Sequence, residues 1–259
     1  MVSKAQIKLV RSLQLKKFRD ELGLFVAEGD KCVEELRKGF ELETLIKSEG
    51  MKELTNERFL LASPKEIEQM SGLRTPQGTI GIFRKRPEGT FSLSENSLVL
   101  ALDGIQDPGN LGTIIRTCDW FGVHDILCSL DTADCYNPKV VQATMGALAR
   151  VRVHYVDLPE ELSVISHQHS DVRIYGTLLE GQNMYEVLER LTVNGERLAN
   201  EGIVIMGNEG NGISQAVRKL ITHPIRIPSF PPDADTSESL NVSIATAIVL
   251  AELRRKSNI

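Results

Sequence analysis

The second half of the sequence contains three polar segments whose side chains could bind a ligand or take part in a reaction. The first carries Asn110 and, six residues later, Arg116. The second places Glu209 among glycines, and the third follows a loop rich in Pro and Asp with Ser239 and Asn241. Amides, hydroxyls and a guanidinium can hold an anionic substrate and stabilise negative charge that develops during a reaction. The three segments are therefore candidates for one active site, provided that the fold brings them together.

Each of these residues also has a purely structural interpretation. Asn110 is suited to cap the N-terminus of a helix, as are Ser239 and Asn241. Arg116 is suited to pair with Asp119, three residues further along a helix. A separation of six residues corresponds to about 600° on a helix, so Asn110 and Arg116 would point about 120° apart. Their joint action therefore requires Asn110 to lie in the loop before the helix.

The glycines around Glu209 argue against one common cofactor. Starting at Gly207 they form the pattern G-x-x-G-x-G, whereas the dinucleotide fingerprint is G-x-G-x-x-G. The segment also follows the fifth expected strand of its domain, and the acidic residue that should accompany the fingerprint is missing. An NAD-type oxidoreductase is therefore the least favoured function class.

The elements that must position these segments alternate between short β-branched runs and longer runs of helical period, which is typical of a mostly parallel α/β sheet. We expect six strands at 98–102, 125–129, 151–156, 172–177, 203–207 and 224–228. We expect helices at 110–121, 138–149, 159–166, 184–191, 212–221 and 239–255. In open α/β sheets, ligands bind beyond the carboxyl ends of the strands, and the three polar segments all follow strands.

A separate small α/β domain is expected at residues 1–86. Its expected strands are 24–28, 42–47, 58–62 and 78–84, and its expected helices lie near 4–19, 29–38 and 64–71. Pro87 and Gly89 interrupt both patterns, so we expect a linker at 87–97 and a second domain at 98–259.

Composition excludes several other classes. Apolar residues make up 41% and charged residues 25% of the chain, as in ordinary globular proteins. No apolar run approaches the ~18–20 residues of a membrane span, and the charged N-terminus does not resemble a signal peptide, so we expect a cytoplasmic protein. The four cysteines form no C-x-x-C pair and the histidines lack zinc-site spacing, so we expect reduced thiols and no metal.

Charge is unevenly distributed along the chain. The net charge is −5, yet residues 1–97 hold 17 Lys and Arg against 15 Asp and Glu, whereas residues 98–259 hold 13 against 20. The first twenty residues form a local basic patch in which Asp20 is the only acidic residue. Such a patch can contact RNA phosphates. The cationic residues in question are Lys4, Lys8, Arg11, Lys16, Lys17 and Arg19. A solvated helix face is the alternative interpretation.

Taken together, the three segments resemble the motifs of the SpoU (TrmH) family in the SPOUT superfamily of methyltransferases. The motif N-x-G-x-x-x-R-T matches residues 110–117, G-N-E-G-x-G matches 207–212, and I-P followed by E-S-L-N-V-S matches 227–228 and 238–243. Residues 137–150 are similar to the family's segment before its third strand. Residues 9–35 are similar to the ribosomal-protein-like RNA-binding domain that precedes the catalytic domain in many members. The loop 229–237 is longer than in many relatives.

The resemblance implies transfer of a methyl group from S-adenosylmethionine to the ribose 2′-OH of RNA, with ribosomal RNA favoured over transfer RNA. It implies a deep C-terminal trefoil knot and a homodimer. Carried over residue by residue, the catalytic residues are Asn110, Arg116, Glu209, Ser239 and Asn241. The cofactor contacts are Thr177, Leu178, Gly207, Ile227 and Leu240.

Two questions stay open at this stage. The family assigns the role of base to the arginine that matches Arg116, but a guanidinium stays protonated in proteins. Our hypothesis is that Arg116 holds a phosphate and stabilises the 2′-oxygen while Asn110 fixes its orientation. The second open question is whether the protein is an enzyme at all. The alternative is a non-catalytic RNA-binding or ribosome-assembly factor that retains the fold.

Overall fold

The computed structural model describes residues 1–50, 59–87, 89–94, 97–193, 202–231 and 239–257. By their internal packing the residues divide into two compact units. The first comprises Met1–Glu88 and Asp134–Arg150, and the second comprises Gly89–Ala133 and Val151–Ile259.

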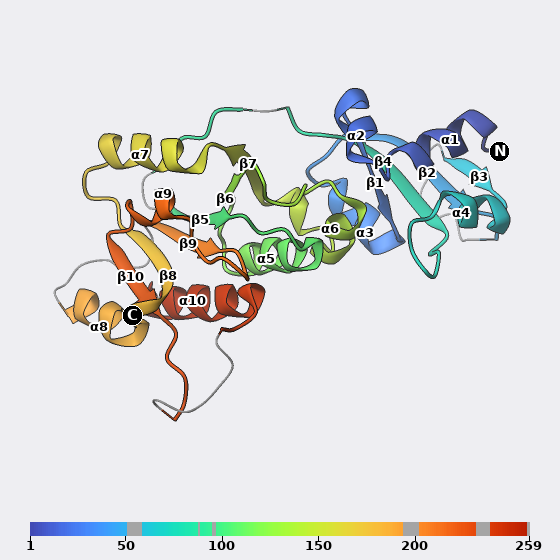
Figure 1. Cartoon of the computed structure of the whole chain (residues 1–259). Coiled ribbons are helices and arrows are strands. Elements are labelled where there is room, and N and C mark those ends of the chain that lie inside the picture. Colours follow the sequence, from blue (N-terminus) through green and yellow to red (C-terminus); the bar gives the residue numbers. More distant parts are fainter. Residues whose placement is uncertain (51–58, 88, 95–96, 194–201, 232–238, 258–259) are drawn as a thin grey trace. The chain divides into compact units, whose positions relative to one another are not determined.

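The first unit contains a four-stranded sheet in the order β1-β4-β2-β3. Its strands are β1 (Leu24–Glu28), β2 (Leu42–Ser48), β3 (Leu60–Ala62) and β4 (Thr79–Arg84), and its helices include α1 (Lys4–Ser12), α2 (Lys16–Leu22), α3 (Asp30–Leu36) and α4 (Pro64–Met70). Only β2 and β3 run parallel (Figure 1). These strands and helices were expected, although residue 58 lies outside the described part of the chain. The helix expected at 4–19 is divided, because Leu15 adopts an extended backbone conformation before α2.

The second unit contains six parallel strands in the order β10-β8-β9-β5-β6-β7, which confirms the predicted α/β fold. The strands are β5 (Leu98–Asp103), β6 (Asp125–Ser129), β7 (Arg152–Val156), β8 (Ile174–Asn183), β9 (Gly202–Gly207) and β10 (His223–Arg226). The helices are α5 (Pro108–Trp120), α7 (Leu158–Gln168), α8 (Met184–Val193), α9 (Gln215–Arg218) and α10 (Val242–Ser257). Central strands such as β5 are buried along their whole length, as expected for a sheet covered on both faces.

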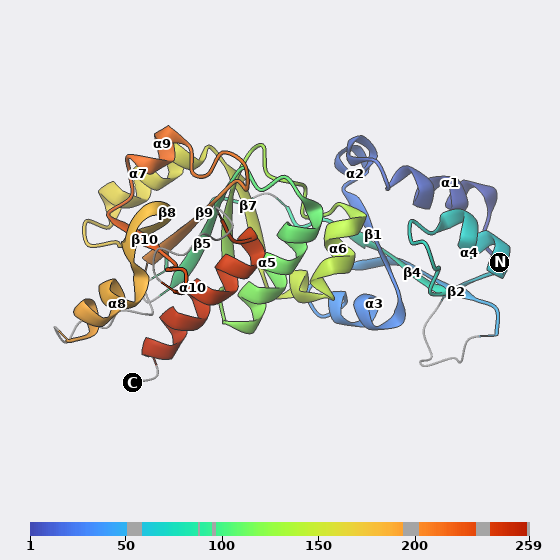
Figure 2. The same ribbon diagram turned by 60° about the horizontal axis from the view of Figure 1, so that its bottom comes forward.

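Helices cover the two faces of this sheet in pairs. Helices α5 and α10 pack against each other on one face, whereas α7 and α9 pack on the other (Figure 2). Alternate side chains of one strand therefore enter different cores. Val99 and Ala101 of β5, for example, belong to the cluster that includes Leu162 of α7 and Val217 of α9.

The segment 134–150 departs from the expected domain boundary. It was expected in the second domain, but it packs with the first unit. Its helix is also broken: α6 (Pro138–Thr144) ends where Met145 and Gly146 adopt positive φ, and the 3-10 turn η1 (Ala147–Ala149) follows. The physical reason is apolar packing, since α6 contacts β1 and η1 contacts α3. Gly39 lies so close to η1 that a Cβ there would be 2.3 Å from the carbonyl oxygen of Ala149.

The C-terminal knot stays a prediction, because the segment 232–238, which precedes α10, lies outside the described residues. None of the helices in the described ranges combines the length and the apolar character needed to cross a lipid bilayer.

Candidate active site

The three polar segments meet at the carboxyl edge of the six-stranded sheet. Strand β5 ends at Asp103 and its neighbour β9 ends at Gly207, directly opposite in the parallel register. Asn208 Nδ2 donates to the carbonyl oxygen of Gly104 at 2.6 Å. The carboxylate of Asp103 accepts from the backbone N–H of Ser214 at 2.7 Å. These bonds fix the loop after β9 to the loop after β5.

Asn110 joins all three segments through its side-chain amide. Its Nδ2 donates to Glu209 Oε1 at 2.6 Å, and its Oδ1 accepts from Asn241 Nδ2 at 3.0 Å. Glu209 and Asn241 lie 99 and 131 positions after Asn110 in the sequence. The predicted grouping of these three polar residues is therefore observed in the structure.

The position of Asn110 corrects the sequence interpretation. The sequence places Asn110 at the start of a helix over 110–121, and its joint action with Arg116 requires it to lie in the loop before that helix. In the structure α5 begins at Pro108, and Asn110 is its third residue. The cap is Asp107, whose carboxylate accepts from the backbone N–H of Asn110 at 2.8 Å. Because Asp107 satisfies this backbone donor, the side chain of Asn110 is available for the other two loops. Proline is well suited to the first position of a helix, so the pair Asp-Pro contained this signal.

The side chain of Asn241 has two roles: its oxygen caps α10, and its nitrogen contacts Asn110. Its Oδ1 accepts from the backbone N–H of Ser243 at 3.0 Å and from the Ser243 hydroxyl at 2.6 Å, while its Nδ2 donates to Asn110. The expectation that Asn241 caps the last helix is confirmed. Ser239 is exposed beside it, and Glu238 of the same motif lies outside the described residues.

Arg116 lies on the same helix as Asn110 but does not contact it. Within the described part of the chain, the Arg116 side chain is exposed and has no hydrogen-bond or salt-bridge partner. With both residues inside α5, they point about 120° apart. The expectation that Asn110 directly orients Arg116 is therefore wrong, because Asn110 is bound to Glu209 and Asn241 instead.

The expected cofactor residues also lie at this edge of the second unit. Between Pro224 and Ile225 the register of β10 against β8 jumps from Gly176 to Gln182, so residues 177–181 have no partner in this ladder. This bulge contains Thr177, whose hydroxyl donates to the carbonyl oxygen of Ile205 at 3.1 Å.

The turn after β9 needs its glycine. A Cβ on Gly207 would lie 2.4 Å from the carbonyl carbon of Gly212 and 2.5 Å from the nitrogen of Ile213. Leu240, just before α10, is 49% exposed. Backbone groups outside the ladder and an exposed leucine fit a ligand such as S-adenosylmethionine, because its adenine has apolar faces and a polar edge. Ile227 follows β10 at the same edge.

The basic patch contains one residue that is not part of the surface. Arg19 is only 1% exposed, and its guanidinium donates to Asp134 Oδ2 at 2.7 and 3.1 Å. Its Nη1 donates to the carbonyl oxygens of Leu13 and Gln14, each at 2.9 Å. The expectation that Arg19 contacts RNA is therefore wrong, because this cation is used inside the first unit. The other five cationic residues of the patch are exposed.

Comparisons with known proteins agree with this geometry. The SpoU rRNA Methylase family matches residues 97–251, and the MRM3-like substrate binding domain matches residues 4–81. The chain is 30% identical over 254 residues to the 23S rRNA (guanosine(2553)-2′-O)-methyltransferase RlmP of Bacillus subtilis, with 96% of each chain covered.

Several solved structures resemble the whole chain, including the following two. One is an RNA methyltransferase of the TrmH family from Porphyromonas gingivalis, with a TM-score of 0.85, 35% identity and coverage of 99% of this chain and 100% of the other. The second is an AdoMet-bound rRNA methyltransferase from Sinorhizobium meliloti, with a TM-score of 0.81, 29% identity and coverage of 98% and 97%. The family match, these relatives and the three motifs that meet through Asn110 all agree. The chain belongs to the SpoU rRNA methylase family.

Proposed function

We propose that the protein transfers a methyl group from S-adenosylmethionine to the ribose 2′-OH of a nucleotide in ribosomal RNA. The observation that carries the proposal is the hydrogen-bonded chain from Glu209 through Asn110 to Asn241 at the carboxyl edge of the parallel sheet. Ribosomal RNA is favoured over transfer RNA because the relative that matches 96% of the chain is named as a 23S rRNA methyltransferase.

The cofactor would be held by the bulge of β8, the turn after β9 and the segments around β10 and α10. The residues that would contact it are Thr177, Leu178, Gly207, Ile227 and Leu240. S-adenosylmethionine supplies an electrophilic methyl group on a sulfonium. The protein must then place the 2′-oxygen in line with that group, which is a matter of positioning.

We assign Arg116 to binding the negatively charged groups of the RNA substrate. Its guanidinium remains protonated, so it acts as a donor of hydrogen bonds rather than as a base. We assign it to an RNA phosphate beside the target ribose and to the negative charge that develops on the 2′-oxygen. Its exposure and its lack of partners among the described residues support this role.

Asn110, Glu209, Asn241 and Ser239 would shape the pocket next to Arg116. Asn110 uses its N–H on Glu209 and its oxygen on Asn241, so its amide orientation is determined by both. We therefore assign Asn110 to positioning of the two neighbouring loops. Ser239 would contact the ribose.

The first unit would supply electrostatic contacts to RNA. Lys4, Lys8 and Arg11 are spaced by four and three residues along α1, so they share one face of the helix, and all three are exposed. Lys16 and Lys17 at the start of α2 are exposed as well. Such cations bind phosphates by releasing counterions, which gives a dependence on salt.

We also propose a homodimer and a cytoplasmic location. Trp120 of α5 is 84% exposed and Ile244 of α10 is 53% exposed, which supports a second copy covering this pair of helices. Sedimentation of the wild-type chain and of a Trp120→Ala variant tests the dimer, which we expect the variant to weaken.

The cytoplasmic location is supported by the four cysteines, which are free and buried, as is usual in a reducing compartment.

The decisive experiment uses ribosomal RNA from cells that lack the protein. The wild-type chain with tritiated S-adenosylmethionine should label one nucleotide, and alkaline hydrolysis should leave a resistant dinucleotide there, because a 2′-O-methyl group blocks cleavage. RNA binding without S-adenosylmethionine binding in calorimetry would refute the proposal in favour of a non-catalytic RNA-binding factor. Label on a base rather than on ribose would also refute it.

A further inference from the structure

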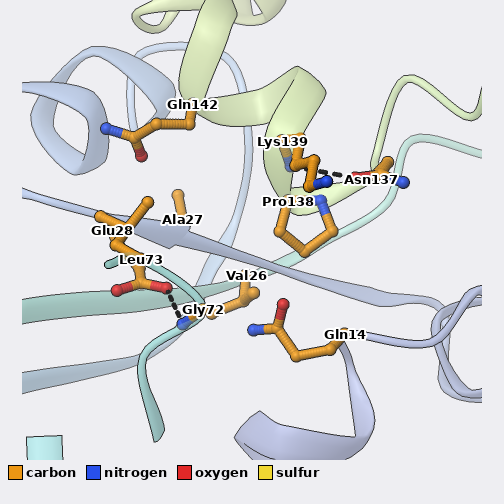
Figure 3. Close-up of a pocket in the computed structure, with 10 residues that line it drawn as sticks. All are labelled: Gln14, Val26, Ala27, Glu28, Gly72, Leu73, Asn137, Pro138, Lys139 and Gln142. Atoms are coloured by element: carbon orange, nitrogen blue, oxygen red, sulfur yellow. Dashed lines mark hydrogen bonds between the residues drawn. The ribbon is translucent and has the colours of Figure 1, made fainter. Parts of the chain in front are cut away.

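The first unit contains a cavity of about 210 Å³ that the proposed reaction does not use (Figure 3). It lies between the turn after α1, strand β1, the segment around Gly72 and the start of α6. The lining residues are Gln14, Val26, Ala27, Glu28, Gly72, Leu73, Asn137, Pro138, Lys139 and Gln142. All of them belong to the first unit. Pockets for drug-sized ligands have volumes of about 300–1,000 Å³, so this cavity suits a smaller group.

A buried carboxylate and a buried amide give the cavity its chemistry. Glu28 is 5% exposed, and its oxygens accept from the backbone N–H of Gly72 at 2.7 Å and from the hydroxyl of Ser71. A carboxylate offers about four acceptor sites, so two further N–H donors can be accommodated. Gln14 Nε2 is buried and has no hydrogen-bond partner among the described residues. An unpaired buried donor is unfavourable until a ligand with an acceptor binds it.

A buried ion pair holds opposite walls of the cavity in place. Arg19 donates to the backbone carbonyl of Gln14 and to the carboxylate of Asp134. The other oxygen of Asp134 accepts from the backbone N–H of Tyr136 at 2.9 Å, directly before the Asn137 cap of α6. The distance between the Gln14 turn and the start of α6 is thereby set by contacts inside the unit. A preformed site of this kind loses little entropy on binding.

The lining decides which ligand the cavity fits. A phosphate would meet the buried carboxylate of Glu28, and like charges repel, whereas the cation among the lining residues, Lys139, is exposed. A nucleobase instead has apolar faces, which fit Val26, Leu73 and Pro138, and an edge with both donors and acceptors. Guanine presents two adjacent N–H donors beside a carbonyl acceptor, which matches the free capacity of Glu28 together with the amide of Gln14.

We propose that this cavity binds one unpaired guanine base of the RNA substrate and so contributes to the choice of RNA. The inference rests on the proposed function, because it assumes that RNA is the substrate. Sequence-specific recognition of RNA mostly uses unstacked bases that enter protein pockets. The exposed cations of α1 lie on the same unit and would hold the flanking phosphates.

The test measures binding of fluorescein-labelled hexaribonucleotides to the full chain by anisotropy. The sequence UUUGUU should bind at least about fivefold more tightly than UUUUUU, since a bidentate contact to a base edge discriminates by roughly that factor or more. Replacing the guanine with inosine, which lacks the 2-amino group, should remove part of this preference. Equal affinity of the wild-type chain for both hexamers would overturn the inference.

Two variants probe the two polar groups of the cavity, the carboxylate of Glu28 and the amide of Gln14. Glu28→Gln replaces an acceptor with a donor and should reduce the guanine preference to within about twofold while leaving affinity for UUUUUU unchanged. Exposed Glu68→Gln is its control for charge. Gly72→Ala should act in the same way, because its Cβ would lie 2.7 Å from Gln14 Oε1 and would displace that flexible amide into the cavity. Gly89→Ala, which meets no atom within 4 Å, is the matched control.

Methyl transfer to ribosomal RNA is measured in parallel to separate the two proposals. A wild-type chain that methylates RNA but has no guanine preference would refute the cavity and leave the function intact. A guanine preference without methyl transfer would refute the function alone. If both cavity variants keep the wild-type preference, with melting curves that match wild type, the inference is wrong.

Discussion

Removing one partner of the buried pair of Arg19 and Asp134 should be among the most destabilising single substitutions in the first unit. Asp134→Ala removes the carboxylate that accepts two of the four hydrogen bonds of Arg19, at 2.7 and 3.1 Å. The guanidinium, 1% exposed, then retains only the carbonyl oxygens of Leu13 and Gln14. Removing one partner of a buried ion pair costs about 3–5 kcal/mol, because the remaining charge is uncompensated. We expect about 3 kcal/mol, since two carbonyl partners remain.

The double variant Arg19→Met/Asp134→Ala should be less destabilised than Asp134→Ala alone. Methionine is unbranched and apolar and needs no polar partner, and apolar replacements of buried pairs are often neutral or stabilising. Lys16→Gln is the contrasting control, because the Lys16–Asp20 pair is exposed and such pairs contribute about 0–1 kcal/mol.

The assay must follow the first unit by itself, because the two units can unfold separately. Urea titration with hydrogen exchange and mass spectrometry of peptides from residues 1–50 and 134–150 provides this. A loss of about 3 kcal/mol corresponds to a fall in the melting temperature of the unit of at least ~12 °C. A loss below about 1 kcal/mol for Asp134→Ala, or a double variant less stable than the single one, would refute the reasoning.

The remaining predictions concern the second unit, the surface of α1 and one thiol. Gly207→Ala should abolish S-adenosylmethionine binding in calorimetry, because its Cβ would lie 2.4 Å from the backbone of the same turn; unchanged affinity would contradict this. Arg116→Lys should lower kcat by about 10²–10³ with little change in RNA affinity, since a lysine lacks the planar pair of donors; near-normal turnover would exclude our role for the arginine. The double variant Lys8→Gln/Arg11→Gln should reduce the salt slope of RNA binding by about 1.4–1.8, and an unaltered slope would remove α1 from the interface. Burial raises the pKa of Cys32 to about 11, so iodoacetamide at pH 8 should label it only after unfolding, as peptide mass spectrometry would reveal.

The sheet was predictable because its strands are short β-branched runs with clear ends. Strands β1 and β6 have the predicted bounds, since Gly23 and Gly29 flank β1 and the apolar run of β6 lies between Asp125 and Ser129. The segment 134–150 was misplaced because periodicity reports that a helix is amphipathic but not which core receives its apolar face. Val140 and Val141 are buried, and Cys32, whose thiol lies 3.9 Å from the carbonyl oxygen of Val141, is 109 residues earlier in the sequence.

Motif spacing identified Asn110, Glu209 and Asn241 as neighbours, but not the bonds between them. A pattern such as N-x-G-x-x-x-R-T contains no information on where the helix begins, and the cap at Asp107 places Asn110 one turn inside it. The burial of Arg19 was also not predictable from charge, because the five other basic residues near it in the sequence suggested an exposed surface. Its partner Asp134 is 115 residues away.

The contact between Asn110 and Asn241 also has a consequence for the order in which the molecule is made. These residues are 131 positions apart, so at about 5–20 residues per second a ribosome adds Asn241 roughly 7–26 s after Asn110. Until then α10 has no capped start and Asn110 lacks one of its two partners. A nascent chain therefore contains Arg116 and the turn at Gly207 before the three segments of the active site can be held together. Methyl transfer should begin only after α10 has docked. For a protein that we propose acts on ribosomal RNA, this delay would keep each new copy inactive while it is still attached to the particle that makes it.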